Sequence, residues 1–212
     1  MNHGKQQTTN NRQQMTIGYL SPTNLFTDRK GWSGTYFSTR QAIDNSAVNL
    51  LSSQWTASSV INDYHASKDR VFVLPFGANI DDSKIVQAQV YQSGRLNVLF
   101  TGVDWERKGG QIAVDTVKKL RYNGADVHLY ICGIRDLAHE VTELDFVENL
   151  GFLNKNKPEE YQKYLDVWSN SHLLLLPTRA ECSAIVFNEA SAYGVPILST
   201  DTGGIVIMFL TI

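Results

Sequence analysis

Two carboxylates frame the start of a predicted helix in the last third of this 212-residue chain. Glu181 and Glu189 lie in the stretch 177–190, directly after the apolar run 173–176, which is typical of a buried parallel strand. Glu181 precedes the helix and Glu189 lies on its second turn, too far apart for the acid and nucleophile of a hydrolase. Because each carboxylate accepts two hydroxyl hydrogen bonds, the two suit a ribose and a sugar at different points of one ligand.

Each of these residues also has a simpler interpretation. Glu189 alone would be a charge on a helix surface, and Glu181 alone a favourable partner of the helix dipole. Cys182 lies beside them, but no His in the sequence offers itself as the base of a nucleophile, so we interpret Cys182 as buried filler, like Cys132. Only in combination with other loops do the carboxylates indicate a site.

A basic loop precedes another predicted helix. In the segment 105–110 two adjacent cations, Arg107 and Lys108, are followed by Gly109 and Gly110 at a helix start. Free amides and the helix dipole favour an anion there by about 0.3–2 kcal/mol, and Lys108 adds a full charge. The loop therefore suits a diphosphate, although a solvated basic turn is the alternative interpretation when it is taken alone.

The elements that must position these residues alternate between strand and helix. Apolar segments predict strands at 97–101, 127–132, 172–176 and 195–199, and 147–151 is a candidate for a further short strand. Helical spacing predicts helices at 110–122, 158–168 and 183–193. Such alternation implies an α/β fold with a parallel sheet, which binds ligands at the carboxyl ends of its strands. The loops 102–110, 178–183 and 200–204 therefore meet at one edge of the sheet.

The first part of the chain shows the same alternation on a smaller scale. It contains a predicted strand (16–20), a loop (21–34), a helix (35–43), a strand (48–53), a helix (54–64) and a strand (71–74). We divide the chain into a disordered polar tail (1–14), a first Rossmann-like domain (15–74), a linker (75–96) with a candidate helix at 85–91, and a second Rossmann-like domain (97–212).

Composition excludes several classes of protein. The formal net charge is -2, and the Lys and Arg residues are scattered, so nucleic acid is not an expected partner. The polar start lacks the apolar core of a signal peptide, and no apolar run is long enough to span a bilayer, so we predict a cytoplasmic protein. The two cysteines lack the spacing of a disulfide framework or a zinc site.

Three ordered motifs resemble those of the group 1, or family 4, retaining glycosyltransferases with the GT-B fold. They are the segment FTGVDWERKGG (100–110), the E-x7-E spacing of Glu181 and Glu189, and the segment DTGGI (201–205). The similarity covers 71–205 well and 15–45 more loosely. In that looser part Gly31, Ser33 and Gly34 form the candidate loop of the first domain.

The resemblance implies a nucleotide-diphosphate sugar as donor, bound mainly by the second domain. Lys108, with Arg107 beside it, would hold the diphosphate, Glu189 the ribose and Glu181 the sugar hydroxyls, so that Lys108 and Glu181 are the implied catalytic residues. The other implied donor-binding residues are Gly102, Ser183, Ala184, Ile185, Gly203 and Gly204. In this family the acceptor attacks from the face that the nucleoside diphosphate leaves, and neither a cofactor nor a metal is implied.

The chain also departs from the family pattern. Val103 stands where many members carry Arg, so the cationic role falls to Arg107 and Lys108. We interpret the first domain as truncated and the second as nearly complete, and none of the five His residues has a matching context. Two alternatives stay open: a catalytically inactive nucleotide-sugar-binding fragment, and a nucleotide-sugar epimerase of the same architecture. The acceptor (a glycan, a lipid or a small molecule) and peripheral membrane contact also stay open.

Overall fold

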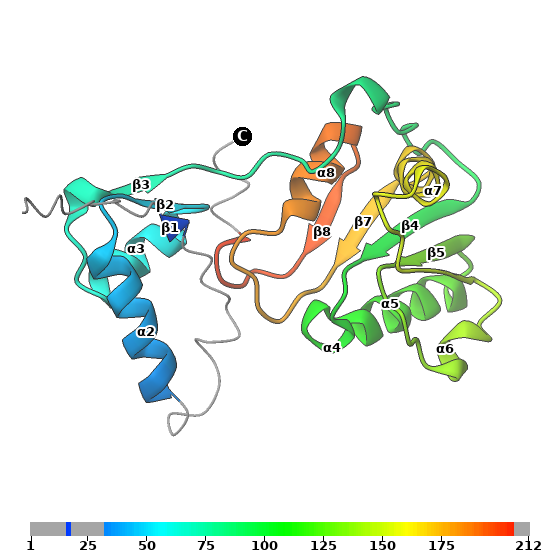
Figure 1. Cartoon of the computed structure of the whole chain (residues 1–212). Coiled ribbons are helices and arrows are strands. Elements are labelled where there is room, and N and C mark those ends of the chain that lie inside the picture. Colours follow the sequence, from blue (N-terminus) through cyan, green and yellow to red (C-terminus); the bar gives the residue numbers. More distant parts are fainter. Residues whose placement is uncertain (1–15, 18–31, 206–212) are drawn as a thin grey trace, which may run out of the picture. The chain divides into compact units, whose positions relative to one another are not determined.

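The computed structural model of the protein describes residues 16–17 and 32–205, and it divides the chain into two units, Met1–Pro75 and Phe76–Ile212 (Figure 1). Each unit contains a parallel sheet with helices, which confirms the predicted α/β class. The predicted tail (1–14) and the apolar end (206–212) lie outside the described residues. Among the described residues, no helix has the length and apolar character needed to cross a membrane.

The first unit is built on a parallel sheet with the strand order β1-β2-β3. Its elements are β1 (Thr16–Ile17), α2 (Trp32–Asn45), β2 (Asn49–Leu51), α3 (Gln54–Asn62), the 3-10 helix η1 (Lys68–Arg70) and β3 (Val71–Val73). Helix α3 begins after Ser53, whose hydroxyl accepts a hydrogen bond from the Thr56 amide at 3.2 Å. This side-chain cap satisfies one of the free amides of the helix start.

One predicted boundary in the first unit is wrong. Ser33 and Gly34 lie in the first turn of α2 and not in a loop, while Gly31 lies outside the described residues. A glycine costs a helix only about 1 kcal/mol relative to alanine, so Gly34 does not prevent the helix from starting ahead of it. Ser33 and Gly34 therefore belong to the first turn of a helix and not to the predicted loop.

The second unit is built on a five-stranded parallel sheet with the order β6-β5-β4-β7-β8. The strands are β4 (Leu96–Thr101), β5 (Val127–Cys132), β6 (Val147–Gly151), β7 (Leu173–Leu176) and β8 (Ile197–Ser199). The helices are η2 (Asp82–Lys84), α4 (Trp105–Lys108), α5 (Gly110–Tyr122), α6 (His139–Thr142), α7 (Pro158–Ser169) and α8 (Ile185–Tyr193). Since α5 and α6 lie on one side of the sheet and α7 and α8 on the other (Figure 1), the central strands are covered on both faces. This is why β4 and β7 are nearly continuous apolar runs.

The core of the second unit explains how α7 and α8 hold their places. Trp168 of α7 and Tyr193 of α8 are fully buried and stack with ring centroids 6.0 Å apart. Tyr164 packs edge-on against Trp168, with ring centroids 6.2 Å apart. Large buried rings remove much apolar surface from water, and they fix the two helices that carry candidate site residues.

The predicted helix at 85–91 is wrong. This segment is irregular and lies against the end of α8, where the Ala88 amide donates to the Tyr193 carbonyl at 2.9 Å and the Gln87 side chain donates to the Ala192 carbonyl at 2.8 Å. The β-branched residues Ile85 and Val86 lower the helix propensity of the segment, so these contacts with α8 outweigh it. Its backbone is therefore tied to the C-terminal end of α8.

Candidate functional site

The loops after β4 and β7 meet where the strand order reverses. Open α/β sheets bind ligands outside the carboxyl ends of the strands at such a switch point. The Arg179 amide donates to the Arg107 carbonyl at 2.8 Å, and the Thr178 hydroxyl donates to the same carbonyl at 3.0 Å. Gly109 has a φ of 75°, and a Cβ there would collide with the Pro177 carbonyl. The two loops are therefore held together by their backbones.

Three charged side chains gather at this junction. The Lys108 ammonium donates to Glu181 Oε2, and Arg107 Nη1 lies 3.4 Å from the same oxygen. The Lys108 and Glu181 side chains are only 11% and 3% exposed, so they form a buried ion pair. Burial lowers the pKa of Lys108, while the charge of Glu181 opposes this effect. The structure thus brings together the two implied catalytic residues and the neighbouring cation.

Asp104 fixes Arg107 within this cluster. Its carboxylate accepts a hydrogen bond from the Arg107 amide at 3.1 Å, which caps α4, and lies 3.3 Å from Arg107 Nε. Arg107 Nη1 also donates to the Ala180 carbonyl at 3.1 Å. The sequence reasoning missed both α4 and this role of Asp104. An aspartate directly before a short polar stretch is an N-cap signal that could have found them.

The loop after β8 packs on the loop after β7. The Gly204 amide donates to the Glu181 carbonyl at 3.0 Å, and the Thr202 hydroxyl donates to the Arg179 carbonyl at 3.2 Å. Gly203 has a φ of 58°, and a Cβ there would collide with the Glu181 carbonyl. Gly203 and Gly204 therefore support Glu181 through its backbone. On the other side, Gly102 packs against the Lys108 side chain, since an added Cβ would lie 2.9 Å from Lys108 Cγ.

Helix α8 starts two residues later than predicted, at Ile185. Ser183 and Ala184 precede it as buried residues, and Ala184 occupies the N-cap position without a side-chain hydrogen bond. The N-cap side chain therefore offers no acceptor to the first amides of α8, of which the Phe187 amide donates to the Ala184 carbonyl at 2.9 Å. Together with the positive end of the helix dipole, these amides favour an anion beside Glu181.

Glu189 belongs to a second cluster. Lys155 Nζ donates to Glu189 Oε1 at 2.6 Å, and the Tyr164 hydroxyl donates to Oε2 at 2.6 Å. Burial, and then the neighbouring Glu189 charge, raise the pKa of Tyr164 well above its usual range, so its hydroxyl stays protonated and donates. Glu189 is therefore a buried carboxylate and not a helix-surface charge. Lys155 and Tyr164 are the residues of this cluster that the sequence reasoning missed.

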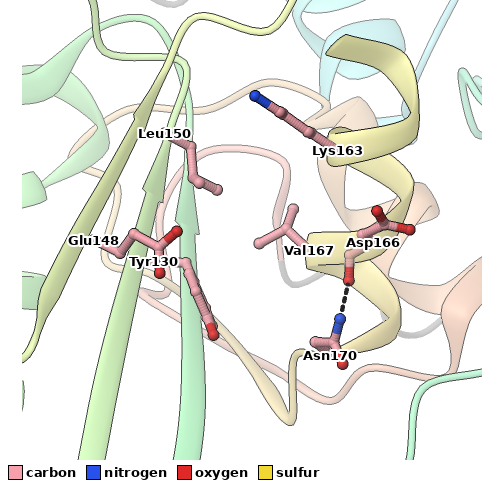
Figure 2. A pocket seen from close by; sticks show the side chains of 7 residues that line it. All are labelled: Tyr130, Glu148, Leu150, Lys163, Asp166, Val167 and Asn170. Atoms are coloured by element: carbon pink, nitrogen blue, oxygen red, sulfur yellow. Dashed lines mark hydrogen bonds between the residues drawn. The ribbon is translucent and has the colours of Figure 1, made fainter. Parts of the chain in front are cut away.

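Two pockets of about 340 Å³ each open on the second unit. The first adjoins the basic loop, and in it the Arg135 guanidinium lies 4.1 Å from the centre of the Phe152 ring. Its lining residues are Val103, Trp105, Gly133, Ile134, Arg135, Asp136 and Phe152. The second lies between α7 and the strands β5 and β6 (Figure 2). Its lining, which includes Tyr130, Glu148 and Asp166, contains none of the predicted site residues.

Cys132 is buried at the end of β5. Burial raises the pKa of its thiol to about 11, so the reactive thiolate is scarce under mildly alkaline conditions. We expect iodoacetamide to leave Cys132 unmodified in the folded chain and to alkylate it in denaturant, as followed by mass spectrometry of peptides. Rapid alkylation in the folded chain would contradict this buried environment.

In the part of the chain that the structure describes, no three His, Cys, Asp or Glu side chains gather in a way that could hold a metal ion. The described chemistry is instead that of cations, carboxylates and backbone amides at the carboxyl edge of a parallel sheet. The protein is therefore a Rossmann-like α/β protein. Its candidate site lies where the strand order reverses and is suited to binding an anion.

Comparison with known proteins gives the family. The family model described as glycosyl transferases group 1 matches residues 95–209, more than half of the chain, and the chain belongs to this family. It is 25% identical over 180 residues to the D-inositol 3-phosphate glycosyltransferase of Paenarthrobacter aurescens (strain TC1), a match that covers 78% of this chain and 43% of that relative. The chain thus spans less than half the length of the curated relatives it matches.

Solved glycosyltransferases share the fold. WaaG, which is involved in lipopolysaccharide biosynthesis, superimposes with a TM-score of 0.62 at 18% identity, covering 83% of this chain and 51% of WaaG. TarM of S. aureus, solved in a complex that includes UDP, superimposes with a TM-score of 0.61 at 11% identity, covering 84% of this chain and 34% of TarM. The predicted GT-B type of parallel-sheet fold is confirmed.

Proposed function

We propose that this chain binds the donor in a retaining glycosyltransferase, which transfers a sugar from a nucleotide-diphosphate sugar to an acceptor. The observation that carries the proposal is the buried cluster of Arg107, Lys108 and Glu181 at the sheet switch point, next to the uncapped start of α8. UDP in the TarM complex supports a nucleoside diphosphate as the ligand class.

The cluster suits a diphosphate that gains charge as it departs. When the bond between the sugar C1 and the phosphate oxygen breaks, negative charge accumulates on the leaving diphosphate. Lys108, Arg107 and the first amides of α8 are cations and donors that are already oriented, so they stabilise this charge with little reorganisation. Glu181, held in place by Gly203 and Gly204, would accept hydrogen bonds from the sugar hydroxyls.

Retention of configuration follows if the acceptor hydroxyl attacks C1 from the face that the diphosphate leaves. The acceptor oxygen then forms the new bond to C1, the bond from C1 to the phosphate oxygen breaks, and the acceptor proton passes to the departing phosphate. In this scheme the ribose lies toward Glu189, and the pocket whose lining includes Trp105, Arg135 and Phe152 would take the planar base. The scheme requires no cofactor and no metal.

Calorimetry of the 212-residue chain with UDP, GDP and ADP tests donor binding. We expect one of the three to bind and to raise the melting temperature, since ligand at 100 times its Kd stabilises a protein by about 2.7 kcal/mol. Absence of binding to all three by a cooperatively folded chain would overturn the proposal.

Turnover is a separate test. We expect release of the nucleoside diphosphate from the matching nucleotide sugar, at a rate that depends on added acceptor and is lost in Lys108→Ala and in Glu189→Ala. Binding without release under any acceptor tested would favour the alternative of a binding fragment. An epimerase would instead convert the nucleotide sugar without releasing the diphosphate.

A further inference from the structure

Lys155, in the turn between β6 and α7, contacts a carboxylate, a backbone carbonyl and an aromatic ring. Its ammonium donates to Glu189 Oε1 at 2.6 Å and to the Asn79 carbonyl at 3.0 Å, and it lies 4.2 Å from the centre of the Tyr164 ring. The two hydrogen bonds use two of the three N–H donors of the ammonium. The bond to Glu189 is the contact through which Lys155 can act on a ligand that Glu189 binds.

The loop that carries Lys155 is braced from both ends. The Asn154 amide donates to Glu160 Oε2 at 2.7 Å, and the Asn154 side chain accepts from the Asn156 amide at 3.0 Å. The Lys157 ammonium donates to Glu160 Oε1 at 2.7 Å. Because these bonds fix the turn between β6 and α7, Lys155 is directed toward Glu189 by the local backbone and not only by its own flexible side chain.

Glu189 is held at both of its oxygens. Lys155 bonds Oε1 and Tyr164 bonds Oε2, and the Glu189 side chain is 5% exposed. A carboxylate offers about four lone-pair positions, so roughly one remains on each oxygen. Two acceptors with a fixed spacing and orientation match two neighbouring hydroxyl groups, such as the 2′ and 3′ hydroxyls of a ribose.

We propose that Lys155 is a positioning residue that holds the Glu189 carboxylate oriented for the vicinal diol of a nucleotide ribose. This inference rests on the proposed donor-binding function. Lys155 supplies the counter-charge that a buried carboxylate needs, because burying an unpaired charge is costly. Tyr164 supplies both the second hydrogen bond and the aromatic face on which the ammonium lies.

The test compares a nucleoside diphosphate with its 2′,3′-dideoxy form. Calorimetry first identifies which of UDP, GDP and ADP binds, and the Kd ratio of the dideoxy to the natural form is then measured. For the natural chain we expect a ratio of roughly 10 to 100, since hydrogen bonds to a charged group contribute about 1.5–3 kcal/mol. In Lys155→Met we expect the Kd ratio of the dideoxy to the natural form to fall to about 3 or less. The Kd of the dideoxy form should stay nearly unchanged.

Matched variants distinguish a positioning role of Lys155 from a general loss of folding or of nucleotide binding. Lys118→Met removes an exposed ammonium of α5, outside the turn between β6 and α7, and it should keep the natural ratio. Lys155→Arg keeps the charge and should restore most of the ratio. Tyr164→Phe keeps the ring but loses the donor, and it should lower the ratio by about threefold. This variant carries the test if Lys155→Met does not fold.

Each outcome decides between the two proposals. If the natural chain binds no nucleoside diphosphate, the proposed function fails and the inference fails with it. If the natural chain discriminates and Lys155→Met keeps the same ratio, only the inference is overturned. A variant that weakens both ligand forms equally, or a natural chain that binds both equally, would also overturn it, because Lys155 would then not act through recognition of the diol.

Discussion

Replacing Lys108 by methionine is expected to weaken nucleoside diphosphate binding by about 30-fold or more. Truncating one member of a buried, hydrogen-bonded charge pair commonly costs a complex about 2–5 kcal/mol. Lys108 is the most buried cation of the site and lies against Gly102 and Glu181. Titration calorimetry of the natural chain and of Lys108→Met with the diphosphate that binds measures the effect.

The same substitution is also expected to destabilise the second unit. Among the described residues it leaves Glu181, which is 3% exposed, with Arg107 at 3.4 Å as its remaining charged partner. Breaking a buried ion pair by removing one partner costs about 3–5 kcal/mol, a large share of the roughly 5–15 kcal/mol that stabilises a typical domain. Urea denaturation would show this loss as a lower midpoint at a similar slope.

A second variant separates the two effects of Lys108. The double variant Lys108→Met, Glu181→Gln removes both charges of the pair. No unpaired charge is then buried at this position, so most of the lost stability should return. Binding of the diphosphate should not return, since the cation is still missing. If the double variant were stable and bound as tightly as the natural chain, Lys108 would have a structural role only, and the assignment of the diphosphate to this loop would be wrong.

The strands of the second unit were the most predictable part of the chain. The predicted bounds of β5 and β6 agree with the structure, and β4 and β7 differ by one residue at one end. Strands β4 and β7 are short apolar runs whose pattern is set by burial on both faces of the sheet, whereas the edge strand β6 carries the exposed Glu148 and Asn149. The prediction of a helix at 85–91 was wrong because the conformation of this segment depends on its contacts with α8, and the local residue spacing does not encode these contacts.

The candidate site was predictable only where topology alone brings residues together. Parallel strands end at one edge, and this rule brought Lys108, Glu181 and Gly203 into one region before any contact was known. It could not show that Lys108 and Glu181 bond each other, since the pairing depends on side-chain directions. Lys155 follows β6 at the same edge and could have been noted, but nothing in its spacing from Glu189 indicates the bond between them.

Replacing Gly109 by alanine is expected to destabilise the second unit by roughly 2–5 kcal/mol. The residue ends α4 and precedes α5 with a φ of 75°, where a side chain costs about 1–2 kcal/mol. A Cβ there would also collide with the Pro177 backbone, and such overpacking adds about 1–3 kcal/mol. The clash would push the loop of Lys108 away from the loop of Glu181, so diphosphate binding should weaken together with stability.

Gly124 provides the matched control for Gly109. It also has a positive φ, 91°, but a Cβ there would meet nothing within 4 Å. Gly124→Ala should therefore show only the conformational cost of about 1–2 kcal/mol and should leave the Kd of the diphosphate unchanged. The difference between the two variants in urea denaturation isolates the contact with Pro177. Equal losses of stability in both, with binding intact, would mean that the close approach of the two loops does not hold Lys108 and Glu181 together.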